Sequence, residues 1–201
     1  MKIISAILAC LFFVVAGCQQ ASSPVSENPE LIQGSQNKSK AIVLYYSRTG
    51  DTRVVARSIQ EAMDCDLQEI KDLKDRSGIK GFWGGMKDVT NKVKAEIKPQ
   101  TLNLDAYELI VICSPVWGMH FIPAITTFMS SMDFKDKRIV LAAVARMNMK
   151  AENMEELNKE IGSKGGEVLK DFVVKTWFKS PEEIKEQTTE HIKDIAELQS
   201  K

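Results

Sequence analysis

The chain has 201 residues, of which 44% are hydrophobic, and its 27 Lys and Arg residues balance 27 Asp and Glu residues, so the formal net charge is zero. A nucleic-acid-binding domain needs a basic surface, so this balance argues against that class of protein. The part from Ala41 onward, about 160 residues, is long enough for one domain with a single core.

The N-terminal segment reads as an export signal. Lys2 precedes an apolar stretch from Ile3 to Val15, which is shorter than the ~20 residues of a membrane-spanning helix and typical of a signal-peptide core. The stretch ends in Val15-Ala16-Gly17-Cys18, which resembles the bacterial lipoprotein pattern. The resemblance implies a signal peptide over residues 1–17 and lipidation of Cys18. The alternative is a plain secretory signal with an incidental cysteine.

Residues 18–40 follow as a segment rich in Gln, Ser, Asn and Pro, with few apolar residues. Such a composition cannot bury enough surface to fold, so it predicts a flexible tether. Together with lipidation, it implies a membrane-anchored bacterial protein outside the cytoplasm, on the periplasmic or cell-surface side. Removal of residues 1–17 would take away Lys2 and no acid, which leaves a net charge of −1.

An apolar run from Ala41 to Tyr46 predicts a buried strand, and Val55, Ile59, Ala62 and Met63 predict the helix that follows. The loop between them consists of Ser47, Arg48, Thr49, Gly50, Asp51 and Thr52. Free N–H groups at a helix start and nearby hydroxyls suit a phosphate, and the absence of a loop lysine favours a monophosphate. Alternatively, Thr49, Asp51 or Thr52 only caps the helix. Arg48 either pairs with the phosphate or is solvated.

A second uninterrupted apolar run, from Leu109 to Cys113, predicts a parallel strand buried on both faces. It leads into a predicted loop, 114–124, that contains Pro115, Val116, Trp117 and Gly118. Ligands of open parallel sheets lie outside the carboxyl ends of the strands. Trp117 is therefore expected either to face a ligand there or to be an ordinary packed aromatic.

The other elements alternate between strands and helices. A short, edge-like strand is expected at 66–70, and a helix around 82–94 is expected to anchor Trp83 in the core rather than cover a ligand. Pro123 predicts a helix start, and Ser180-Pro181-Glu182-Glu183 predicts another with a capping box. Strands are expected at 139–144, before Ala145, Arg146, Met147 and Asn148, and at 167–175. The alternation indicates an α/β doubly wound sheet of five parallel strands over 41–201.

Cysteine and histidine spacing excludes several kinds of site. Cys65 and Cys113 flank different strands of the predicted sheet and are interpreted as buried free thiols. His120 and His191 lie in no metal-ligand spacing, so no metal site is predicted. The sequence contains no nucleophile elbow and no C-x-x-C pair, and no catalytic acid or base is assigned.

At this point the chain resembles the flavodoxin-like proteins that bind flavin mononucleotide (FMN). The family's phosphate loop is matched by Ser47, Thr49, Gly50 and Thr52, and its first ring loop by the run Ser114-Pro115-Val116-Trp117. The resemblance covers residues 40 to about 198 and implies strand order 2-1-3-4-5, with FMN at the switch point. It implies cofactor contacts from both loops and from Ala145, Arg146, Met147 and Asn148. That third loop has no glycine, unlike the family's usual third loop.

The resemblance implies an FMN-binding electron-transfer protein, tethered to a membrane, that exchanges electrons with a redox partner protein or a quinone-like acceptor. The flavin would supply the redox chemistry, so the protein needs no acid or base of its own. Two alternatives remain: an FMN-dependent reductase that oxidises NAD(P)H and reduces a quinone, and a scaffold that has lost the flavin and binds other proteins.

Overall fold

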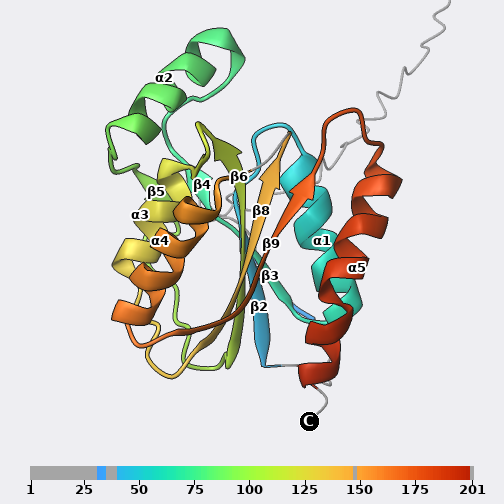
Figure 1. Ribbon diagram of the computed structural model, residues 1–201. Helices are drawn as coiled ribbons and strands as arrows, with labels where there is room; N and C mark the ends of the chain where they lie inside the picture. The colour runs from blue at the N-terminus through green and yellow to red at the C-terminus, as the bar shows by residue number, and fades with distance from the viewer. Residues whose placement is uncertain (1–30, 35–39, 147–148, 200–201) are drawn as a thin grey trace, which may run out of the picture.

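A computed structural model describes residues 31–34, 40–146 and 149–199 (Figure 1). A central sheet lies between two layers of helices, as the alternating pattern predicts. Its strands are β1 (Leu31–Ile32), β2 (Ala41–Tyr45), β3 (Asp66–Glu69), β6 (Leu109–Trp117), β7 (His120–Phe121), β8 (Arg138–Ala145) and β9 (Glu167–Lys175). A separate pair, β4 (Lys71–Asp72) and β5 (Ile97–Lys98), is antiparallel.

The strand order is β1-β3-β2-β6-β8-β9, and every neighbour from β3 to β9 is parallel. With β1 and the β7 extension set aside, this is the order 2-1-3-4-5, and the predicted fold class is confirmed. The carboxyl ends of the parallel strands therefore meet at one edge, which we call the carboxyl edge. It lies at the top of Figure 1, below α2.

Helices cover both faces of the sheet (Figure 1). One face packs against α1 (Asp51–Met63) and α5 (Pro181–Gln199), and the other against α3 (Pro123–Ser131) and α4 (Ala151–Ser163). A further helix, α2 (Gly78–Thr90), rises above the carboxyl edge on the α3 side. Two apolar clusters, one for each face, form the core, because the central strands are buried on both sides.

Local sequence signals determine where several helices begin. The backbone N–H of Ser180 donates to Glu183 Oε2 at 2.7 Å, and the N–H of Glu183 donates to Ser180 Oγ at 3.2 Å, so the predicted capping box of α5 is confirmed. Pro123 is the first residue of α3, where its missing N–H costs nothing.

The chain joins the sheet earlier than the predicted boundary at residue 41. Leu31 and Ile32 lie inside the segment expected to be a tether, but they form β1 and pair with β3. The backbone N–H of Gly34 donates to Asp66 Oδ1 at 2.8 Å and fixes the end of this short strand. Because β1 covers β3, the prediction that the 66–70 strand lies at the sheet edge is wrong.

Both domain cysteines are free and buried, as predicted. Cys113 lies in the middle of the sheet on β6, and Cys65 lies between α1 and β3. Burial raises the pKa of the Cys65 thiol to about 12. Within the described ranges, no helix is both long and apolar enough to cross a bilayer.

Candidate functional site

A cavity of about 650 Å³ opens at the carboxyl edge, between the loop after β2, the end of β6 and helix α2. Of the residues predicted to contact the cofactor, the structure brings nine to its wall: Arg48, Thr49, Asp51, Thr52, Pro115, Val116, Trp117, Gly118 and Arg146. Ser47, Gly50 and Ala145 are not among the lining residues. Met147 and Asn148 fall outside the described residues.

Ser47 and Gly50 shape the loop after β2. Ser47 Oγ accepts the backbone N–H of Gly50 at 3.2 Å and that of Arg53 at 3.3 Å. Gly50 precedes α1 with φ of 110°, a conformation that a residue with a side chain adopts only under strain. No side chain caps α1 at its N-terminal residue, so the alternative that Thr49, Asp51 or Thr52 serves only as a helix cap is wrong.

This loop presents several unused hydrogen-bond donors to the cavity. In the part of the chain that the structure describes, the backbone N–H groups of Thr49, Asp51 and Thr52 have no partner, and neither have the hydroxyls of Thr49 and Thr52. The Thr52 side chain is only 2% exposed. A helix start adds partial positive charge, so the loop suits a small anionic group such as a phosphate monoester.

Arg48 is held by the segment that leads into α2. Its Nε donates to the carbonyl of Arg76 at 2.8 Å, and its Nη2 donates to the carbonyl of Gly78 at 3.0 Å. The guanidinium carbon lies 5.7 Å from the ring centre of Phe82 and 5.8 Å from that of Trp117. Arg48 is thus partly exposed but held by two hydrogen bonds, and it connects the loop after β2 to α2.

The second wall of the cavity is a strand rather than the predicted loop. β6 continues through Trp117, turns at Gly118 and Met119, and returns as β7. Both turn residues have positive φ, 55° and 70°, as a tight hairpin turn requires. Asn153 of α4 donates to the Met119 carbonyl at 2.7 Å, so the hairpin that carries Trp117 is held from two sides.

Trp117 both packs against the protein and lines the cavity, so the two alternatives for it hold together. Its side chain is 8% exposed, and its ring lies so close to α2 that a Cβ added at Gly85 would be 2.1 Å from its Cζ3. Phe82 meets the same ring edge-on, with ring centres 5.8 Å apart. Glycine at position 85 is therefore what lets α2 lie against Trp117.

Trp83 is not a core anchor, and that prediction is wrong. It is 66% exposed at the mouth of the cavity, because Trp117 fills the space under α2 instead. The sequence reasoning also missed other lining residues, namely Gly78, Ile79, Phe82, Met86, Val144 and Thr176. The glycine-rich and aromatic composition of 78–86 was the available signal for the first four.

A buried ion cluster holds the base of α2. Arg76, 5% exposed, donates from Nε to Asp72 Oδ2 at 2.9 Å and from Nη1 to Asp88 of α2. Lys74 pairs with the same Asp88 carboxylate at 2.7 Å. These cations, with the Lys74 hydrogen bond foremost, hold the pKa of Asp88 below its usual value. The cluster joins β4 to α2 and so fixes the roof of the cavity.

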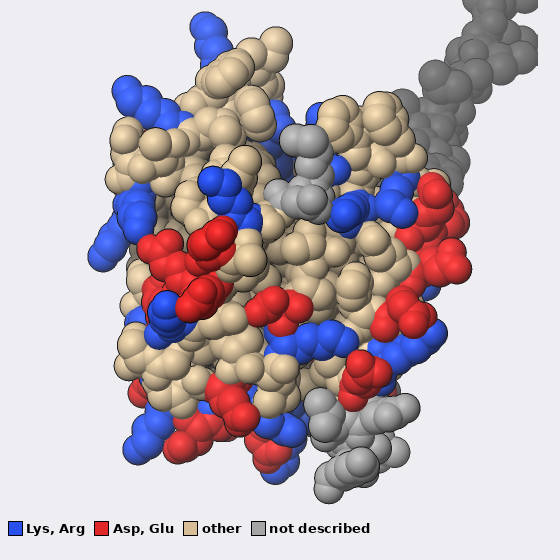
Figure 2. Space-filling model, in the orientation of Figure 1, with Lys and Arg blue, Asp and Glu red and all other residues tan. Residues whose placement is uncertain are grey.

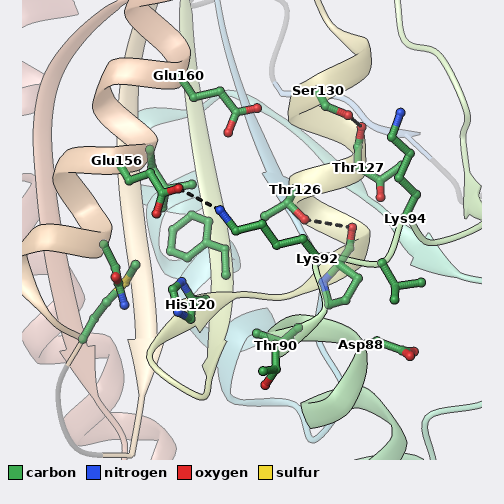
Figure 3. Close-up of a pocket in the computed structure, with 17 residues that line it drawn as sticks. Asp88, Thr90, Lys92, Lys94, His120, Thr126, Thr127, Ser130, Glu156 and Glu160 are labelled. Carbon is green, nitrogen blue, oxygen red and sulfur yellow. Dashed lines mark hydrogen bonds and ion pairs between the residues drawn. The ribbon is translucent and has the colours of Figure 1, made fainter.

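A second cavity, of about 310 Å³, lies on the α3 and α4 side of the sheet (Figure 3). Lys92 reaches across it and pairs with Glu156 at 3.0 Å. His120 points into this second cavity and does not line the first, so the structure gives it no place beside a ligand of the first. Among the described residues, no cluster of His, Cys, Asp and Glu could hold a metal ion.

The fold has relatives of known structure. A proposed flavoprotein from Bacteroides uniformis is 22% identical, with a TM-score of 0.62 over 78% of this chain and 98% of that one. One from Bacteroides eggerthii is 18% identical, with a TM-score of 0.61 over 75% and 96%. A Lactobacillus acidophilus flavoprotein in complex with FMN is 23% identical, with a TM-score of 0.57 over 66% and 91%.

These likenesses establish the fold, whereas the family is shown by sequence. None of the curated proteins compared with the chain matches it. The family model described as flavodoxin, however, matches residues 40–183. That stretch is more than half of the chain and holds the loop after β2, α2 and the Trp117 hairpin, so the chain belongs to the flavodoxin family.

Proposed function

We propose that the protein binds FMN in the cavity at the carboxyl edge and acts as an electron-transfer protein. The observation that carries the proposal is the pairing of unused donors at Thr49, Asp51 and Thr52 with an aromatic wall at Trp117 in one cavity. A phosphate needs hydrogen-bond donors, and a flat, apolar ring packs well against an aromatic wall. A FMN complex of a relative with this fold supports the same choice of ligand.

The residues present fit this cofactor in distinct ways. Backbone N–H groups and hydroxyls of Thr49 and Thr52 would hold the phosphate, while Trp117 and the backbone around Gly118 would bound the ring. When bound, the flavin supplies the one- and two-electron chemistry. The chain supplies affinity, orientation and partial exclusion of water, for which α2 forms the roof.

Thr52→Val is expected to weaken FMN binding without destabilising the fold. Valine keeps the shape, and the hydroxyl that it removes belongs to a residue that lines the cavity and makes no hydrogen bond to any described residue. A hydrogen bond to a charged group contributes ~1.5 to 3 kcal/mol, so the dissociation constant for FMN should rise about tenfold or more. Fluorescence titration of the apoprotein measures this rise.

Two controls accompany the Thr52→Val titration. Thr189→Val, at a half-buried position on α5 away from the cavity, should leave FMN affinity unchanged. Riboflavin, which lacks the phosphate, should bind wild type and Thr52→Val alike. Equal losses for FMN and riboflavin would place the phosphate elsewhere.

We further propose that the protein is anchored through lipid on Cys18 and lies outside the cytoplasm. The support is the sequence Val15-Ala16-Gly17-Cys18 after a short apolar core. Acyl chains contribute ~0.8 kcal/mol per buried methylene, so two or more chains give a durable anchor.

Cys18→Ser should abolish lipidation and leave the domain folded, since the described fold begins at Leu31. Mass spectrometry of the N-terminal peptide and detergent partitioning of the intact protein measure this. A wild-type protein whose N-terminus is not an acylated Cys18 would contradict the proposal.

A further inference from the structure

Four large apolar side chains stand exposed around the mouth of the cavity. Ile79 and Trp83 on α2 are 78% and 66% exposed, and Trp177 and Phe178 after β9 are 50% and 91% exposed. Ile79 and Trp83 line the cavity on one side, and Thr176, next to Trp177, lines it on the other. We call these four residues, three of which are aromatic, the aromatic rim. Exposed apolar groups gathered around a site mark a surface that meets a partner or a membrane.

Most charged residues beside the aromatic rim are basic, although Asp51 also lines the cavity. The segments 76–87 and 172–181, each of which contributes lining residues, contain no Asp or Glu. Five exposed or partly exposed basic residues in these segments or at Arg146 have no ion pair with any described residue; they are Lys80, Lys87, Arg146, Lys175 and Lys179. In Figure 2 the upper part of the molecule shows Lys and Arg among uncharged residues, while Asp and Glu gather lower, over α4 and α5. Tryptophan beside unpaired cations is typical of a surface at an anionic lipid headgroup layer.

The direction of β1 places its first residue on the side of the carboxyl edge. β1 is antiparallel to β3, with Leu31 beside Gln68 and Ile32 beside Leu67. Since β3 runs toward the carboxyl edge, the N-terminal end of β1, at Leu31, points to that edge. Only 12 residues lie between Cys18 and Leu31, so the connection is 13 residue steps long. At ~3.3 to 3.6 Å per step, it reaches at most about 47 Å.

We infer that the aromatic rim docks on a bilayer that contains anionic phospholipid, so that the mouth of the cofactor cavity faces the membrane. The inference rests on the proposed lipid anchor for the short connection to the bilayer, but the rim and its cations would meet lipid by their own chemistry. A cavity held in this way would exchange electrons with an acceptor dissolved in, or exposed at, the membrane surface.

Tryptophan fluorescence tests the docking directly. The full-length lipidated protein is reconstituted in vesicles of zwitterionic lipid, alone or mixed with anionic lipid, with bromine on the acyl chains as a contact quencher. Trp83 and Trp177 should be quenched in the anionic vesicles. The variant Trp83→Phe/Trp177→Phe keeps only the third tryptophan, Trp117, which is 8% exposed. The fluorescence of this variant should not be quenched.

A matched pair of charge reversals separates docking from simple attachment. Lys80→Glu, beside the rim, replaces an attraction of ~1 kcal/mol to the anionic surface by a repulsion. The ratio of protein with a quenched rim to protein with an unquenched rim should therefore fall about tenfold or more. Lys135→Glu, exposed before β8 at the opposite edge, should leave the ratio unchanged. Equal effects of both variants would overturn the inference.

The outcome for docking is distinct from the outcome for the anchor. Mass spectrometry of the N-terminal peptide reports whether Cys18 carries lipid, whatever the fluorescence shows. A lipidated protein without quenching of Trp83 or Trp177 would overturn the docking and leave the anchor standing, with a protein as the occupant of the rim. If the wild-type protein carried no lipid on Cys18, the anchor would be contradicted, and quenching of that protein by the same anionic vesicles would still support the docking.

Discussion

Arg76→Ala is expected to lower the free energy of unfolding by about 3–5 kcal/mol. The substitution leaves the Asp72 carboxylate, 1% exposed, and the Asp88 carboxylate, 13% exposed, without the guanidinium that joins them. Uncompensated buried charge costs more than the ion pair itself contributes. Because Asp88 lies on α2, FMN affinity should fall as well. Urea unfolding followed by tryptophan fluorescence measures the stability.

An exposed ion pair provides the control for Arg76. Arg138 Nη2 lies 3.9 Å from Glu108 Oε2, and both side chains are at least one-third exposed. Arg138→Ala should therefore cost no more than about 1 kcal/mol. If Arg76→Ala were as mild as Arg138→Ala, the ion cluster would not be what holds the base of α2.

Gly85→Ala and Gly84→Ala are expected to have opposite effects, although both replace a glycine in the same helix. A Cβ at Gly85 would lie 2.1 Å from the Trp117 ring, so α2 or the ring must move, which costs typically ~1–3 kcal/mol. A Cβ at Gly84 would have no atom within 4 Å. Gly84→Ala should therefore gain up to about 1 kcal/mol from helix propensity.

The glycine pair also reports on the cavity, because both variants gain the same helix propensity and differ only in the contact with Trp117. Gly85→Ala should weaken FMN binding, while Gly84→Ala should not. Urea unfolding and FMN titration of the two proteins measure both effects. Equal behaviour of the two variants would mean that α2 does not rest on Trp117 in solution.

The sheet could be predicted from sequence because its strands are buried on both faces. Runs such as 109–113 and 139–144 carry that signal without help from their neighbours. The end of β6 could not be predicted, since Pro115 reads as a loop residue. Pairing with β2 stops at Cys113, so at Ser114 and Pro115 the strand has only β8 as a partner, and a proline is tolerated there.

The roof of the site depends on contacts that no local pattern reveals. Trp83 and Trp117 are both plausible anchors by sequence, and the packing of Trp117 on Gly85 decides which one is buried. β1 contains only two residues, too few for a periodic pattern. The position of the loop from Ser47 to Thr52, in contrast, could be predicted because its signals are local: a strand end, a glycine and a helix start.

The central claim is that the cavity at the carboxyl edge binds FMN largely through hydrogen bonds to its phosphate. One titration tests this claim most directly. FMN and riboflavin share the ring and differ in the phosphate, so their dissociation constants for the wild-type apoprotein isolate that contact. With hydrogen bonds to a charged group at ~1.5 to 3 kcal/mol each, two or more of them predict FMN binding at least about 100-fold tighter than riboflavin. Equal affinity for the two ligands, or no saturable binding of FMN, would contradict the account.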